Sequence, residues 1–200
     1  MKLLIAAAAA IATLQTQSTL AQDVNVFVTS QTFTGDLGGV VGADAICQEL
    51  ACSAGLPGNY KAWLSDSSSS PANDFDQGTA YSLVDGTAIA SSFADLTDGS
   101  LQNPINKDEN GVTITSGILN VWTNTNDDGT RRSSTDCQGW TSSSSSFAGT
   151  TGNASRKDTT WTFFSNLNCA VSARLYCFQQ DDTGTYNVVI EDRCLAYMFN

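Results

Sequence analysis

Residues 124–129, Asn-Thr-Asn-Asp-Asp-Gly, alternate side-chain oxygens in the manner of a calcium-binding loop. In such loops alternate ligands face the ion and a glycine permits the sharp turn. The candidate ligands are Asn124, Asn126 and Asp128. The bidentate glutamate that should end the loop is missing, because Thr135 stands at its place. The segment is therefore either a calcium site, the one cofactor that the sequence suggests, or a tight turn at Asp128-Gly129.

The sequence contains no histidine. This excludes Ser-His-Asp and Cys-His catalysis, imidazole-ligated zinc and histidine-based pH switches. Catalysis would then require two carboxylates that converge on one bond. Asp108-Glu109 and Asp127-Asp128 are adjacent pairs, and adjacent side chains of an extended chain point in opposite directions. We therefore expect a protein without enzymatic activity.

Residues 1–21 have the pattern of a secretory signal peptide. Lys2 precedes an apolar run over residues 3–14, and small side chains precede a cleavage site expected after Ala21. The run is too short to span a bilayer at about 1.5 Å of helix per residue. We expect a secreted or cell-surface protein with no membrane insertion after cleavage.

All six cysteines follow this leader: Cys47, Cys52, Cys137, Cys169, Cys177 and Cys194. An even number of cysteines in a secreted chain predicts disulfides in an oxidising compartment. A zinc site is the alternative, but the sequence has no CxxC pair. We therefore expect the cysteines to be oxidised.

Apolar residues recur at three- and four-residue steps over residues 43–54, which predicts a helix with one apolar face. At about 100° per residue, Cys47 lies near the centre of this face and Cys52 on the opposite side. The two are therefore not expected to bond to each other. Cys52 needs a partner that crosses the outside of the helix, and Cys194 in the C-terminal tail is the natural one.

Acidic residues outnumber basic ones by 20 to 9, for a net charge of −11. A surface of this sign repels phosphate backbones, so nucleic acid is a poor partner. The same argument disfavours heparin-like polyanions and anionic membranes. The length suits one domain, and hydrophobic residues, at 41%, suffice for one core.

The other expected elements are short strands between long loops. Alternation and β-branched or aromatic residues predict strands at residues 24–29, 60–64, 121–123, 161–164 and 173–178, and a hairpin over 81–90 that turns at Asp85-Gly86. Polar or irregular loops are expected at residues 35–42, 65–78, 91–120 and 142–146. The tryptophans lie mostly beside apolar strand residues and are expected in the core, with Trp140 the exception.

Three groups of residues carry a family resemblance. They are Gly-Gly-Val-Val-Gly-Ala-Asp-Ala-Ile-Cys at 38–47 with Asn-Tyr-Lys-Ala-Trp-Leu-Ser at 59–65, Val-Trp at 121–122 with Cys-Gln-Gly-Trp at 137–140, and Trp161 followed by Cys169 and Tyr-Cys-Phe at 176–178. The first two resemble endostatin, and the third resembles the C-terminal signature of C-type-lectin-like domains. The chain is thus similar to endostatin-like domains, including a bacterial family of endostatin-like outer-surface proteins.

The resemblance implies an α+β, C-type-lectin-like fold. Such a fold has short mixed or antiparallel strands, one or two helices and long disulfide-tied loops. We place this domain at residues 22–180, followed by a tail at residues 181–200 that is docked through Cys194.

The resemblance also implies two disulfides, Cys47–Cys177 and Cys137–Cys169. The pairing of Cys52 with Cys194 lies outside the family pattern and rests on the helix geometry and on elimination.

Some properties of the relatives do not carry over. Endostatin holds zinc through histidines and heparin through surface arginines, which are absent or few here. The sugar-binding calcium site needs a Trp-Asn-Asp triplet, whereas Thr162 follows Trp161. Its Pro motif has only a loose counterpart in Gln-Asn-Pro-Ile-Asn at residues 102–106.

We expect a non-catalytic binding module for an extracellular protein ligand, with adhesion to matrix or a host factor as its role. Loops at residues 91–120 and 141–160 are where such a fold binds. The candidate ligand-binding residues are Asn103, Asn106, Asp108, Glu109 and Trp140. The alternatives are a calcium-dependent carbohydrate-binding lectin and a structural module of a surface coat.

Overall fold

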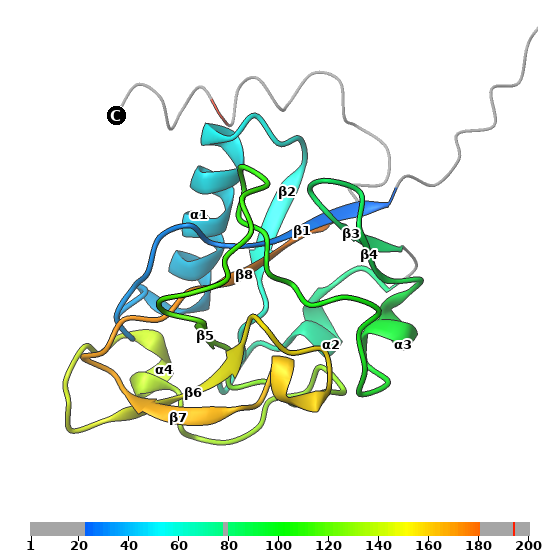
Figure 1. Cartoon of the computed structure of the whole chain (residues 1–200). Helices are drawn as coiled ribbons and strands as arrows, with labels where there is room; N and C mark the ends of the chain where they lie inside the picture. The colour runs from blue at the N-terminus through cyan, green and yellow to red at the C-terminus, as the bar shows by residue number, and fades with distance from the viewer. Residues whose placement is uncertain (1–22, 78–79, 181–193, 195–200) are drawn as a thin grey trace, which may run out of the picture.

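The computed structural model describes residues 23–77, 80–180 and 194. The expected signal peptide (1–21) and, apart from Cys194, the expected tail (181–200) lie outside the described residues. The described chain is an α+β protein with two sheets and one long helix (Figure 1). The mixed class expected from the sequence is therefore confirmed.

A five-stranded sheet holds the two ends of the domain together. Its strand order is β2-β8-β1-β3-β4, with β1 at Val24–Val28, β2 at Asn59–Ala62, β3 at Tyr81–Leu83, β4 at Ala88–Ala90 and β8 at Tyr176–Gln180. The first strand, β1, is antiparallel to the last, β8, and parallel to β3. The predicted hairpin is confirmed, since the N–H of Gly86 donates to the carbonyl of Leu83 between β3 and β4.

A second, antiparallel sheet consists of β5 (Asn120–Trp122), β6 (Ala148–Asn153) and β7 (Ser165–Asn168). The strand expected at residues 161–164 is wrong. Thr159–Trp161 instead form a 3-10 helix, η1, whose first turn is capped by the Asp158 carboxylate. The cap turns the chain before it enters β7, and it places Trp161 in the core.

Helix α1 spans Gly39–Ser53 and starts inside the segment expected to be a loop. Gly42 explains the early start, because a Cβ there would lie 2.0 Å from the carbonyl oxygen of Leu37. The glycines thus allow the chain to pack closely as it enters the helix. In the sequence alone, the same glycine-rich segment indicates a loop. The other α-helices of the described chain are single turns, α2 (Pro71–Asp74), α3 (Phe93–Leu96) and α4 (Cys137–Trp140).

Aromatic rings fill the core. Trp63 contacts the rings of Phe75, Phe93, Trp161 and Phe178, and Trp122 lies 5.8 Å from Trp140 between ring centroids. All four tryptophans are fully buried. The expectation that the tryptophans pack in the core is confirmed, and it extends to Trp140.

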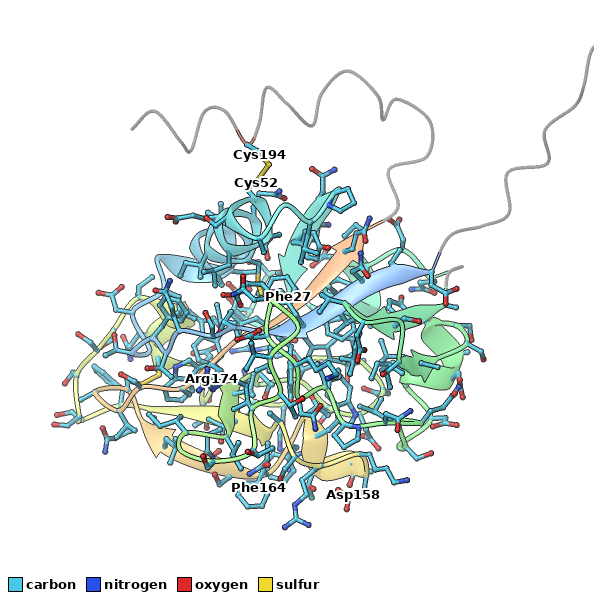
Figure 2. The ribbon with its side chains drawn as sticks, turned by 45° about the horizontal axis from the view of Figure 1, so that its top comes forward. Phe27, Cys52, Asp158, Phe164, Arg174 and Cys194 are labelled. Carbon is cyan, nitrogen blue, oxygen red and sulfur yellow. A yellow bond between two sulfur atoms is a disulfide. The ribbon has the colours of Figure 1, made fainter. Side chains whose placement is uncertain are left out.

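Three disulfides tie these elements, in the expected pairings. Cys47 on the inner side of α1 bonds Cys177 of β8, and Cys137 of α4 bonds Cys169 beyond β7. Figure 2 shows Cys52 on the outer side of α1, bonded to Cys194. The helix geometry derived from the sequence therefore placed the two cysteines of α1 on the correct sides.

Buried Arg174 lies just before β8 and joins its own segment to two others. Its guanidinium donates to the carbonyls of Thr29, Ser30 and Ile118 over 2.6 to 2.7 Å. Burial lowers the pKa of Arg174, and the nearby carboxylates of Asp108 and Glu109 oppose this shift. Figure 2 shows Arg174 within the domain, between the two sheets' strands.

Candidate binding hollow

A small hollow opens where α1, β2 and α2 meet. Its volume is about 130 Å³. The residues that line it are Val40, Asp44, Lys61, Ala62, Leu64, Ser69, Ser70, Pro71, Asp74 and Phe75. A pocket for a drug-sized ligand has roughly 300–1,000 Å³, whereas a cavity of roughly 150 Å³ holds a benzene. The hollow therefore has room for one side chain of a partner.

Asp44 is the acid of the lining whose pKa is clearly shifted. Its Oδ1 accepts a hydrogen bond from the N–H of Ala62 at 2.8 Å. Burial raises the pKa of Asp44 from 3.8 to about 6, outweighing the opposite effects of this bond and of Lys61. A half-buried carboxyl with a raised pKa inside a hollow is a common feature of binding and active sites.

Two further charged side chains lie at the hollow. The Nζ of Lys61 donates to the backbone carbonyl of Asp74 at 2.7 Å. The carboxylate of Asp74 accepts hydrogen bonds from the Ser69 hydroxyl at 2.6 Å and from the Ser70 N–H at 2.9 Å. These bonds hold the lysine and the start of α2 in place, so that the hollow has a fixed rim.

The sequence positions these groups through simple local rules. Val40 and Asp44 are four residues apart in α1 and therefore lie on one face of the helix. Val41, three residues before Asp44, adjoins the same face and is 81% exposed. Pro71 begins α2, where its missing N–H removes no helical hydrogen bond. An exposed apolar side chain thus lies one helical turn from the carboxylate of the hollow, outside the lining itself.

The candidate calcium ligands already use their oxygens in the protein. Asn124 is buried, and its Oδ1 accepts from the hydroxyl of Ser133. The Oδ1 of Asn126 accepts from the guanidinium of Arg132 at 2.9 Å, and the Oδ1 of Asp128 accepts from Thr130. Within the described residues, the acidic and cysteine side chains form no cluster of three that could hold a metal.

The geometry of residues 124–131 fits the alternative interpretation, a tight turn. The N–H of Gly129 donates to the carbonyl of Asn126, and the N–H of Asn126 donates to the carbonyl of Thr130. Thr125 and Arg131 pair across this turn. The expected tight turn at Asp128-Gly129 is therefore present.

Asp108 and Glu109 serve the fold instead of a ligand. Both are 5% exposed. The carboxylate of Asp108 accepts from the N–H groups of Asn110 and Val112, which closes its own turn. Glu109 accepts from the N–H and the hydroxyl of Ser30 and thus ties its loop to the end of β1. Their expected role at a ligand surface is corrected, because their oxygens face protein donors.

The two asparagines of the same loop lie apart from the hollow. Asn103 is exposed, and its Nδ2 donates to the carbonyl of Ala88 in β4. Asn106 accepts a backbone hydrogen bond from Ile114 and is partly exposed. Neither lines the hollow, so the structure does not gather the predicted ligand-binding residues at one place.

The expectation for Trp140 is wrong. The side chain is fully buried, and its Nε1 donates to the carbonyl of Ser65 at 3.0 Å. Cys137, Gln138 and Trp140 all have positive φ, which bends the chain of α4 inward. This backbone turn carries the indole into the core, away from any ligand on the surface.

The hollow itself is absent from the sequence-based candidates. Its lining comes from residues 40–75, which the sequence divides among a helix, a strand and a polar loop. The one available signal was Asp44, a carboxylate inside the otherwise uncharged first half of the expected helix.

Residues 30–157 match the protein family described as "Protein of unknown function (DUF1554)". The match spans 128 of the 200 residues. The chain belongs to this family. The matched DUF1554 span contains the whole lining of the hollow and the first three cysteines of the chain, and it ends before β7 and β8. No curated protein matches the chain.

Proposed function

We propose that this DUF1554 protein is a non-catalytic binding module, secreted or displayed outside the cell, that recognises an extracellular protein. Adhesion to matrix or to a host factor is the expected role. The observation that carries the proposal is a hollow sized for one side chain, with the 81% exposed Val41 one helical turn from Asp44 in its lining. Interfaces between proteins are dominated by a few anchoring side chains that enter such hollows, surrounded by apolar contacts.

The covalent structure supports an extracellular location. Three disulfides join all six cysteines, and bonds of this kind persist in oxidising compartments. In the part of the chain that the structure describes, the helices are too short or too polar to cross a bilayer. The proposed route of export is the signal peptide expected at residues 1–21.

A C-type-lectin-like, endostatin-like fold is part of the same proposal. Its support is the antiparallel pairing of the first and last strands, β1 and β8, together with the disulfide from Cys47 of α1 to Cys177 of β8. The second expected disulfide, Cys137–Cys169, adds to this support. A scaffold of this kind holds long loops on a rigid base, which suits recognition.

The proposal is tested with the oxidised mature protein on a biosensor panel of matrix proteins and plasma proteins. We expect saturable binding to at least one of them. Val41→Ser should weaken that binding by about tenfold, the equivalent of about 1.4 kcal/mol. Val112→Ser is the matched control, because Val112 is also exposed, at 58%, and lies outside α1 in a different segment of the chain.

Two outcomes would overturn the proposal. One is a panel without binding above background, and the other is a Val41→Ser variant with the affinity of the native protein. Binding to glycans that a chelator abolishes would instead favour a calcium-dependent lectin.

A further inference from the structure

We infer that the hollow between α1, β2 and α2 recognises a lysine side chain. The identity of the partner rests on the proposed function, whereas the chemistry of recognition rests on the hollow itself. The hollow offers an acidic end and apolar walls, and each of these matches one part of a lysine.

The acidic end is Asp44, and its hydrogen bonding selects an ammonium over a guanidinium. Its Oδ1 already accepts the N–H of Ala62 at 2.8 Å. Among the described residues, Oδ2 has no hydrogen-bond donor, so one oxygen is left for a ligand. A guanidinium binds a carboxylate best through two parallel bonds, whereas an ammonium is a compact point charge that needs one oxygen.

The walls suit the methylene stem of a lysine. Val40, Leu64, Pro71 and Phe75 are apolar members of a lining that also contains polar side chains. Lysine commonly buries its stem along apolar surface while its charged end meets a polar group. The volume of about 130 Å³ has room for one such side chain.

The charge of Asp44 itself and the net charge of the chain favour a cation, whereas Lys61 opposes one. Lys61 and Asp74 are the charged groups that act on it from β2 and α2, and they have opposite signs. Their effects on a bound cation therefore oppose each other, and Asp44 decides the sign of the hollow when it is ionised. The chain as a whole carries a net charge of −11, which attracts a cationic partner.

Ionisation of Asp44 then makes binding depend on pH. Burial holds the pKa of Asp44 at about 6, and an ammonium favours the ionised carboxylate. At pH 5 about one molecule in ten has this carboxylate ionised, whereas nearly all do at pH 7.5, so affinity should rise about tenfold between the two.

The test is an NMR titration of the oxidised, 15N-labelled mature protein. The probe is Nα-acetyl-lysine amide, and the neutral control is Nα-acetyl-norleucine amide, which has the same stem without the charge. The amide of Ala62 reports directly, because its N–H donates to Asp44. We expect the lysine probe to shift this resonance, to bind about tenfold more tightly at pH 7.5 than at pH 5, and to lower the pH midpoint of the resonance.

Two variants separate charge recognition from folding. Asp44→Asn keeps the acceptor for Ala62 and should abolish binding of the lysine probe with the spectrum otherwise preserved. Glu49→Gln removes an exposed charge from the same helix and should leave binding unchanged. Equal binding of the norleucine probe, tighter binding of Nα-acetyl-arginine amide, or unchanged binding by Asp44→Asn would each overturn the inference.

The outcomes also distinguish this inference from the proposed function. If the lysine probe does not bind while Val41→Ser still weakens a protein partner, only the inference fails. If the lysine probe binds and no partner protein does, the proposed function fails and the inference stands.

Discussion

The carboxylate of Asp44 accepts a hydrogen bond from the backbone N–H of Ala62, and this bond joins α1 to β2 beside the hollow. The two residues are 18 positions apart in the sequence. A carboxylate in this position both organises the backbone and remains partly available to a ligand. The cost is its burial, which raises its pKa to about 6.

That cost predicts a pH-dependent stability. The folded-state pKa of Asp44 lies above its unfolded value of 3.8, so folding favours the protonated form. The contribution of Asp44 is therefore fully favourable below about pH 4 and is lost as the pH rises through about 6. A shift of about two pKa units corresponds to about 3 kcal/mol.

The substitution Asp44→Asn should remove the loss of stability that occurs as the pH rises. We expect native protein and variant to differ little in their free energy of unfolding at pH 4, and the variant to be more stable by about 2–3 kcal/mol at pH 7.5. Urea unfolding at the two pH values measures the difference. Glu49→Gln, on the same helix, should change it by less than about 0.5 kcal/mol. A pH-independent effect of Asp44→Asn would contradict the prediction.

The Cys47–Cys177 disulfide should contribute much of the stability. It joins residues 130 positions apart, whereas Cys137–Cys169 joins residues 32 apart. The chain-entropy relation gives about 5 and about 4 kcal/mol for bridges of these lengths. In a protein that also lacks the Cys52–Cys194 bridge, through alanine at both positions, the further double alanine variant at 47 and 177 should therefore lose more free energy of unfolding than the variant at 137 and 169. The reverse order in urea unfolding would show that loop length does not set their contributions.

Arg174 should be intolerant of substitution. Its guanidinium donates to three carbonyls in two segments, and Arg174→Met would remove the donor from all three, of which the carbonyl of Thr29 is buried. We expect a loss of about 3–5 kcal/mol in the free energy of unfolding. Arg156→Met, at an exposed arginine, should cost less than about 0.5 kcal/mol. Similar losses for the two variants would contradict this account.

Calcium should not change the thermal stability of the protein. The side-chain oxygens named for Asn124, Asn126 and Asp128 accept hydrogen bonds within the protein, so binding an ion there would break existing contacts. We expect no shift in Tm on addition of millimolar calcium or of a chelator, as measured by thermal melting. A rise in Tm with calcium that Asp128→Asn removes would restore the calcium site.

Local pattern and tertiary geometry account for different parts of this fold. β-branched and aromatic residues predict β1, and the Asp85-Gly86 pair predicts the turn of the β3–β4 hairpin, because both signals are local in the sequence. The sides of α1 on which Cys47 and Cys52 lie follow from helical periodicity. The start of α1 does not, because it depends on the close approach of Gly42 to Leu37.

The site was harder to predict than the fold. Trp140 is buried because positive φ values turn α4 inward, and no spacing rule reveals them. The hollow depends on Asp44, Lys61 and Asp74, which are brought together by packing of α1, β2 and α2. Sequence reasoning can mark Asp44 as unusual, but it cannot show which side chains surround it.

The two disulfides of α1 have a consequence for proteolysis. Cys47 and Cys52 are bonded to Cys177 and Cys194, so a single backbone cut anywhere between residues 53 and 176 leaves two fragments that are covalently linked at least twice. A nicked molecule would migrate as one species until it is reduced. Both surviving links start from one helix, so cleavage of an exposed loop cannot release the half of the chain that carries the hollow.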